Sequence, residues 1–189
     1  MHSNPPKSQV PGDVPSGVPE GTASHRTESQ QVSAWRCAVL TVSDSRTLET
    51  DESGPKVRAL FASAGHDVRH HALLPNDEIR VRALVSEWLA LGSLDVIVIT
   101  GGTGLGSRDR TIEAVRPLFE KELPGFGELF RLLSYQEQVG TAAILSRATA
   151  GAARGTLVFS LPGSRAAVEL AMTRIILAEA GHALREVRR

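Results

Sequence analysis

A glycine-rich segment followed by a carboxylate is the part of this sequence best suited to chemistry. Residues 94–109 read LDVIVITGGTGLGSRD, an apolar run that leads directly into glycines. Because glycine has no Cβ, such a loop can bring consecutive backbone N–H groups close to a phosphate or pyrophosphate. It has neither the GK[ST] of a Walker A loop nor the third glycine of a GxGxxG motif. A tight strand-to-helix turn is the alternative. The candidate ligand-binding residues are Thr100, Gly101, Gly102, Thr103 and Gly104.

Asp109 is a candidate magnesium ligand because it stands beside this loop. Mg²⁺ prefers oxygen ligands and often bridges a carboxylate and phosphate oxygens. The alternative is that the charge of Asp109 only favours the start of a helix near Thr111.

Two further loops follow apolar runs and can reach the same place. Ser43 and Asp44 belong to the segment SDSR, which leads to DESG at residues 51–54, and Pro162, Gly163 and Ser164 follow the apolar run TLVFSL. If these runs are parallel strands, their carboxyl ends meet at one edge of a sheet, where the hydroxyls and carboxylates could line a single pocket. Ordinary turn chemistry explains residues 43–46 equally well, and a plain helix N-cap explains Ser164.

Two other kinds of site are not expected. His66, His70 and His71 are close in the sequence, but adjacent residues of a strand point to opposite faces, so His70 and His71 are poorly placed to share a metal ion. A Ser-His-Asp hydrolase is disfavoured because the sequence has no GxSxG elbow.

The elements that must position these loops alternate between strand and helix. Residues 37–42, 94–100 and 156–161 are nearly continuous apolar runs, as in strands covered on both faces, and residues 67–74 form a weaker strand. The helices are expected from Pro55 to Gly65, from a cap at Asn76 to Gly92, over residues 111–120 and over residues 164–184. This order predicts a three-layer α/β sandwich with a mostly parallel sheet.

Composition limits the class of protein. The chain has 189 residues with 21 Lys+Arg and 21 Asp+Glu, which argues against charge-driven binding of nucleic acid. No apolar run is long enough to span a membrane. With a single cysteine, Cys37, no intramolecular disulfide can form, which fits a cytoplasmic protein.

The first part of the chain differs from the rest. Residues 1–34 contain no Phe, Tyr, Trp, Ile or Leu, and five of the ten prolines fall in the first 19 residues. We therefore expect a disordered tail at residues 1–34, with no signal peptide, and a single folded domain at residues 35–189.

Taken together, the motifs resemble those of a known family along the chain from Cys37 to about Leu184. The matching segments, in family order, are TVSDSR (41–46), DESG (51–54), ITGGTGLGSRD (99–109), PGFGELFRLLSY (124–135), GTAAILSRATAG (140–151) and LVFSLPGS (157–164). They are similar to the MoaB/Mog family of molybdenum cofactor biosynthesis proteins, and the wording PGFGELFR and LSRATAG is closer to the MoaB branch.

The resemblance implies the molybdopterin-binding domain fold, assembled as a homotrimer or a homohexamer, with exposed apolar residues of the segment 126–133 as interface candidates. In active members, the terminal phosphate of molybdopterin attacks the α-phosphorus of ATP bound with Mg²⁺. The products are adenylyl-molybdopterin and pyrophosphate.

Roles are carried over only where the residues match. Asp109 takes the position of the catalytic, magnesium-associated aspartate, and Gly101 to Gly104 take that of the ligand-binding loop. The residues that match segments bordering the pterin site are Ser146, Arg147, Pro162, Gly163 and Ser164.

The departure from the family pattern lies at LPNDE, residues 74–78. Active members have a second catalytic aspartate directly after the proline, where this chain has Asn76. Either Asp77 substitutes from one residue along, which would be rotated by about 100° at a helix start, or activity is reduced. Three hypotheses follow: a molybdopterin adenylyltransferase, a non-catalytic molybdopterin-binding protein of the same pathway, and a structural module whose loops are only turns.

Overall fold

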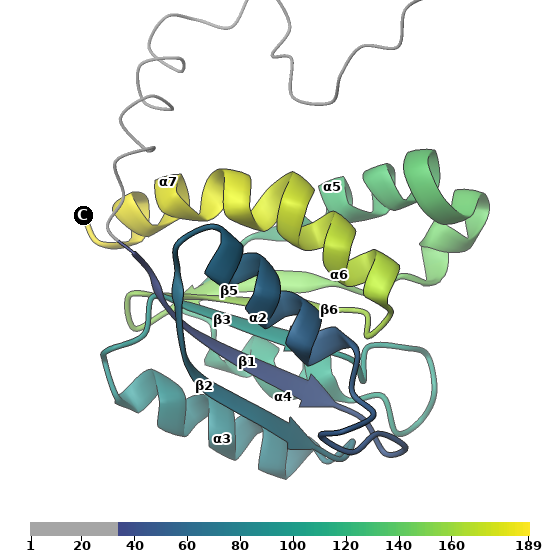
Figure 1. Ribbon diagram of the computed structural model, residues 1–189, viewed down its shortest axis with the longest axis horizontal. Helices are drawn as coiled ribbons and strands as arrows, with labels where there is room; N and C mark the ends of the chain where they lie inside the picture. Colours follow the sequence, from purple (N-terminus) through teal and green to yellow (C-terminus); the bar gives the residue numbers. More distant parts are fainter. Residues whose placement is uncertain (1–33) are drawn as a thin grey trace, which may run out of the picture. The chain divides into compact units, whose positions relative to one another are not determined.

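A six-stranded sheet in the order β2-β1-β3-β6-β5-β4 organises the chain. A computed structural model describes residues 34–189 (Figure 1). The strands are β1 (Arg36–Val42), β2 (Asp67–Leu74), β3 (Val96–Thr100), β4 (Lys121–Glu122), β5 (Thr149–Ala153) and β6 (Thr156–Leu161). Strands β2, β1, β3 and β6 are mutually parallel. At one side of the sheet, β5 pairs antiparallel with β6, and β4 pairs antiparallel with β5. The carboxyl ends of four strands therefore share one edge of the sheet.

Helices cover both faces of the sheet, as Figure 1 shows. On one face lie α2 (Ser53–Ser63), α5 (Pro124–Ser134), α6 (Arg165–Ala171) and α7 (Leu177–Val187). On the other lie α3 (Glu78–Ala90) and α4 (Thr111–Val115). The alternation of the strands explains this division: Val96 and Val98 of β3 contact the first group, whereas Ile97 and Ile99 contact the second.

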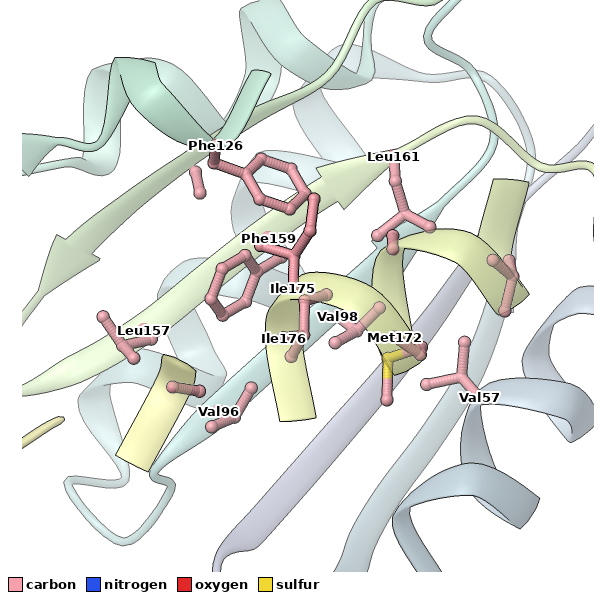
Figure 2. Close-up of a cluster of buried hydrophobic side chains, with 14 of the residues drawn as sticks. Val57, Val96, Val98, Phe126, Leu157, Phe159, Leu161, Met172, Ile175 and Ile176 are labelled. Atoms are coloured by element: carbon pink, nitrogen blue, oxygen red, sulfur yellow. The ribbon is translucent and has the colours of Figure 1, made fainter. Parts of the chain in front are cut away.

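The larger of the two cores lies beneath α2, α5, α6 and α7 (Figure 2). Phe159 of β6 packs edge-to-face on Phe126 of α5, with ring centroids 5.2 Å apart. Met172 and Ile176, which lie on the π-helical turn η4 (Met172–Ile176) between α6 and α7, are almost fully buried. This packing holds β6 against its covering helices and fixes the start of α6 beside the sheet edge.

The structure confirms the α/β class with a mostly parallel sheet. The four strands expected from apolar runs are present, and the helix expected at residues 164–184 is a continuous run with a π turn in it. The helix expected over residues 111–120 is shorter: α4 ends at Val115 and a 3₁₀ turn, η1 (Arg116–Leu118), follows. Pro117 explains this, because it lacks the N–H that would continue the helix.

The helix cap predicted at Asn76 is wrong. Asp77, and not Asn76, is the N-cap of α3, and its carboxylate accepts hydrogen bonds from the backbone N–H groups of Ile79 and Arg80. An Asn can cap equally well by type, so the choice depends on which side chain the turn aims at the open N–H groups.

The expected tail at residues 1–34 lies, apart from Ala34, outside the described residues, and the boundary at residue 35 stays a prediction. Within residues 34–189, no helix combines the length and the apolar character that crossing a membrane requires.

Candidate functional site

A cavity of about 570 Å³ opens at the carboxyl ends of β1, β3 and β6. Pockets of this size commonly hold small ligands. Its walls come from the loops that follow these strands and from the β2–α3 turn. The lining residues are Thr41, Val42, Ser43, Asp44, Ser45, Arg46, Asp51, Glu52, Ser53, Asn76, Thr100, Gly101, Gly102, Asp109, Gly163, Ser164 and Arg165.

Two residues of the glycine loop after β3, Gly101 and Gly102, line this cavity. Gly101 and Gly102 have φ angles of +94° and +63°, which L side chains rarely adopt. A Cβ on Gly101 would lie 2.2 Å from the carbonyl oxygen of Val42, so only glycine lets the loop pass this close to β1. Gly101 N–H donates to Leu161 O, whereas Gly102, Thr103 and Gly104 have no acceptor for their N–H groups among the described residues. Three consecutive open N–H groups are suited to an anion.

Asp109 reaches the cavity from the far end of the same loop. Its Oδ2 accepts a hydrogen bond from Gly106 N–H at 3.1 Å, and its own N–H donates to Gly106 O, so a tight turn holds the carboxylate. No hydrogen bond from the described residues occupies Oδ1. The carboxylate therefore keeps one oxygen open for a cation or a donor.

Asp44, in contrast, is fully engaged. Its Oδ1 accepts from Asn76 N–H at 2.9 Å, and its Oδ2 accepts from Asn76 Nδ2 at 3.2 Å. Arg108, which is largely exposed, forms an ion pair with the same Oδ2 at 3.0 Å. The hydrogen bonds from the Asn76 backbone and side chain, with a contribution from Arg108, lower the pKa of Asp44. This carboxylate ties three segments of the cavity wall together.

Asn76 lines the cavity and Asp77 does not. The carboxylate of Asp77 caps α3 instead. The Asn76 Oδ1 is buried without a hydrogen-bond partner and lies beside Gly102, where a Cβ would approach it to 2.4 Å. The position expected for a second catalytic carboxylate is therefore occupied by the amide of Asn76, and the adjacent carboxylate, Asp77, caps α3 instead.

Asp51 supports the wall near α2. It is buried and accepts hydrogen bonds from Thr41 Oγ1 at 2.7 Å and from the N–H groups of Ser53 and Gly54. Burial alone would raise its pKa, but these hydrogen bonds outweigh burial and lower it. His71 Nε2 lies 3.9 Å from Asp51 Oδ2, and burial, together with nearby Arg58, lowers the pKa of this imidazole. The Asp51 carboxylate thus holds the DESG loop in place through its hydrogen bonds with Ser53 and Gly54.

Several predicted site residues lie outside the cavity lining: Thr103, Gly104, Ser146, Arg147 and Pro162. Arg147 nevertheless acts on the site, because its guanidinium donates to Gly104 O at 3.1 Å and pairs with Glu113 of α4 at 2.5 Å. Arg147 therefore stabilises the glycine loop from outside the cavity lining. Pro162 contributes its carbonyl, which accepts from Thr100 Oγ1 at 3.2 Å.

Three lining residues were not among the predicted site or pocket-lining residues: Thr41, Val42 and Arg165. Thr41 belongs to the predicted strand at residues 37–42 and to the matching segment TVSDSR, and a polar residue so near a strand's carboxyl end is a usable signal. Arg165 follows the segment LPGS directly and stands at the first position of α6. Within the described residues, no group of three or more His, Cys, Asp or Glu side chains is arranged to hold a metal ion.

Comparison with known proteins agrees with this architecture. A family model described as "Probable molybdopterin binding domain" matches residues 38–182. Over 163 residues the chain is 48% identical to "Molybdenum cofactor biosynthesis protein B" of Halalkalibacterium halodurans, a match that covers 86% of this chain and 95% of that protein.

Solved structures give the same result. A crystal structure of a molybdenum cofactor biosynthesis protein B matches with a TM-score of 0.80 and 44% identity, covering 83% of this chain and 98% of the other. The tungsten cofactor synthesizing protein MoaB from Pyrococcus furiosus matches with a TM-score of 0.74 and 40% identity, covering 84% and 99%. The chain therefore belongs to the MoaB/Mog family of molybdenum cofactor biosynthesis proteins, on the MoaB side of that family.

Proposed function

We propose that this protein binds molybdopterin and adenylylates it with ATP and Mg²⁺. The observation that carries the proposal is that Asp109, whose Oδ1 accepts no hydrogen bond from the described residues, lines the same cavity as Gly101 and Gly102, and that the N–H of Gly102 has no acceptor among those residues. An open backbone N–H and an available carboxylate in one cavity can orient phosphate oxygens and hold a cation, which supports transfer at phosphorus.

The donor set fits Mg²⁺ at one position. Asp109 offers a carboxylate oxygen of the kind Mg²⁺ prefers, whereas the oxygens of Asp44 already accept hydrogen bonds from Asn76, and one of them pairs with Arg108. Bound there, Mg²⁺ would neutralise charge on the phosphate oxygens of ATP.

The chain's own residues would then position the reactants. The open N–H of Gly102 would donate to a phosphate oxygen, and Arg147 holds the next part of the loop in place by donating to Gly104 O. The terminal phosphate of molybdopterin would form a bond to the α-phosphorus of ATP, the bond to the bridging oxygen would break, and that oxygen would leave with pyrophosphate. Such a reaction needs orientation and charge neutralisation more than a general base.

A second candidate function is molybdopterin binding without adenylylation. It is favoured by one specific observation: an amide, Asn76, stands in the cavity where active members have a carboxylate, and Asp77 does not replace it.

Incubation of the purified protein with molybdopterin and MgATP tests the first candidate. We expect adenylyl-molybdopterin and pyrophosphate to form, with the rate lowered about 100-fold in Asp109→Asn. Molybdopterin binding without product above that of Asp109→Asn would support the second candidate. If calorimetry detects neither pterin nor nucleotide binding, both are wrong.

We also propose that the protein assembles as a homotrimer or a homohexamer in the cytoplasm. Apolar side chains are exposed together along α5 and the two turns that follow it, η2 (Tyr135–Val139) and η3 (Gly140–Leu145). They are Leu129, Leu132, Tyr135, Val139, Ile144 and Leu145. Of the segment 126–133, Phe126 and Phe130 belong to the core and only its exposed leucines remain available. Such a patch is characteristic of interfaces.

Sedimentation equilibrium tests the assembly. The wild type is expected to sediment as a trimer or a hexamer, and Ile144→Asp, which charges a side chain that is 81% exposed, to shift it toward the monomer. Ile79→Asp is a matched control, because Ile79 is 78% exposed but lies on α3 on the other face of the sheet. A wild-type monomer at micromolar concentration would contradict the assembly.

A further inference from the structure

Both oxygens of the Asp44 carboxylate have partners, two hydrogen bonds from Asn76 and an ion pair with Arg108, and this separates Asp44 from Asp109, whose Oδ1 accepts no hydrogen bond from the described residues. Asn76 supplies its backbone N–H and its Nδ2, and Arg108 supplies a guanidinium nitrogen. Oδ2 accepts a hydrogen bond from Asn76 Nδ2 at 3.2 Å and forms an ion pair with Arg108 at 3.0 Å. The residues involved come from the loop after β1, the β2–α3 turn and the glycine loop. Their contacts link three segments of one wall of the cavity.

The identity of residue 76 decides whether this wall can close by itself. An amide can turn Nδ2 toward Asp44, as it does here. A carboxylate at the same place would set an oxygen about 3 Å from Asp44 Oδ2, and two like charges at that distance repel strongly. Arg108 carries one positive charge on a largely exposed side chain, so it would be shared between two anions. A divalent cation between the carboxylates would then be needed to hold the wall together.

We propose that the Asn76 amide takes the place of a cation in this chain: it bridges the β2–α3 turn to Asp44, the wall assembles without metal, and the site accepts a single Mg²⁺, at Asp109. The inference deepens the proposed function, since it takes Mg²⁺ as the cation of the site. Asn76 is a positioning residue in this account. The unpartnered Oδ1 of Asn76 beside Gly102 agrees with it, because the amide is oriented by its donor side and not by its acceptor.

Thermal unfolding of the full chain, with EDTA or with millimolar Mg²⁺ and without pterin or nucleotide, tests the proposal. Asn76→Asp should lower the Tm in EDTA by about 4 °C or more relative to the wild type, and Mg²⁺ should restore it. Asn76→Ala is the matched control: it removes the same donor but adds no charge, so its Tm should fall in EDTA and Mg²⁺ should not restore it. The Mg²⁺ response at Asp109 is subtracted by repeating each measurement in the Asp109→Asn background.

A charge swap keeps the test decisive if Asn76→Asp does not fold in EDTA. The double variant Asp44→Asn with Asn76→Asp exchanges the amide and the carboxylate across the same contact. It should recover most of the metal-free Tm, because the amide can again donate to the carboxylate.

Three results would overturn the proposal: an Asn76→Asp variant that unfolds at the wild-type temperature in EDTA, an equal Mg²⁺ response in the Asp and Ala variants, or a charge swap no more stable than Asn76→Asp. None of these measurements requires adenylylation. A protein that forms no adenylyl-molybdopterin but shows the metal-dependent Tm pattern would refute the enzyme and leave the role of Asn76 in place.

Discussion

Gly92 and Gly102 have nearly the same backbone conformation in different surroundings. Their φ angles are +61° and +63°, but a Cβ on Gly92 would meet nothing within 4 Å. A Cβ on Gly102 would lie 2.2 Å from Thr111 Oγ1 and 2.4 Å from Asn76 Oδ1. Comparing the two positions therefore separates the cost of backbone strain from the cost of crowding the cavity.

Gly92→Ala should cost about 1 kcal/mol of unfolding free energy, because alanine tolerates positive φ poorly. Gly102→Ala carries the same strain and also crowds two side chains, so we expect a loss of about 3 kcal/mol. Urea unfolding at neutral pH measures both. Equal losses at the two positions would mean that the glycine loop yields easily and is not held by Asn76 and Thr111.

Helix α3 depends on Asp77 for its start. Because the carboxylate accepts from two N–H groups of the first turn, Asp77→Ala should destabilise the protein by about 1 kcal/mol. Asp77→Asn should be nearly neutral, since Asn also caps well. Calorimetric titration with Mg²⁺ should show the same affinity in both variants as in the wild type. A lower Mg²⁺ affinity in Asp77→Asn than in the wild type would mean that Asp77 is a magnesium ligand.

At the scale of elements, the central strands could be predicted because they are buried on both faces of the sheet, and burial requires nearly continuous apolar sequence. Strands β1, β3 and β6 are mostly apolar and, apart from Arg36, buried along their whole length, which the nearly continuous apolar runs of the sequence indicate directly. Strand β5 reads TAGAA and offers no such signal. The glycine of β5 is required by a residue far away in the sequence, because a Cβ on Gly151 would lie 2.4 Å from the ring of Phe119. Packing of this kind cannot be read from a local pattern.

The same reasoning separates the parts of the site. Consecutive glycines after a buried strand predict an anion loop from the sequence alone, and the loop lies in the cavity. The division of roles between Asn76 and Asp77 could not be predicted, because both types cap helices and the turn decides which one faces inward. Arg147 braces Gly104 from 43 positions away, a contact that only the assembled sheet creates.

On the scale of the whole molecule, one carboxylate ties both ends of the described chain to the sheet. Asp95, just before β3, is buried and accepts hydrogen bonds from the backbone and side chain of Arg36 at the start of β1. It also pairs with Arg188, which follows α7. This cluster lies at the amino end of the strands, so it stabilises the fold away from the cavity.

The pH dependence of stability follows from Asp95. Burial alone would raise its pKa, but hydrogen bonds from Arg36 and Arg188 outweigh burial and lower the pKa to about 2. Because the folded-state pKa lies below the unfolded one, near 3.9, the stabilisation is complete above about pH 4 and is lost as the pH falls toward 2. Its size is about 2 kcal/mol.

Asp95→Asn should remove this contribution: the variant should be less stable by about 2 kcal/mol at pH 7, and its unfolding free energy should fall less steeply than that of the wild type between pH 4 and pH 2. Urea unfolding across that range measures both effects. Asp67→Asn is the matched control, since Asp67 is a half-exposed residue at the start of β2 whose side-chain ion pair is with Arg69, and exposed pairs contribute little. Parallel pH curves for Asp95→Asn and the wild type would show that the charge of Asp95 does not hold the last helix to the sheet.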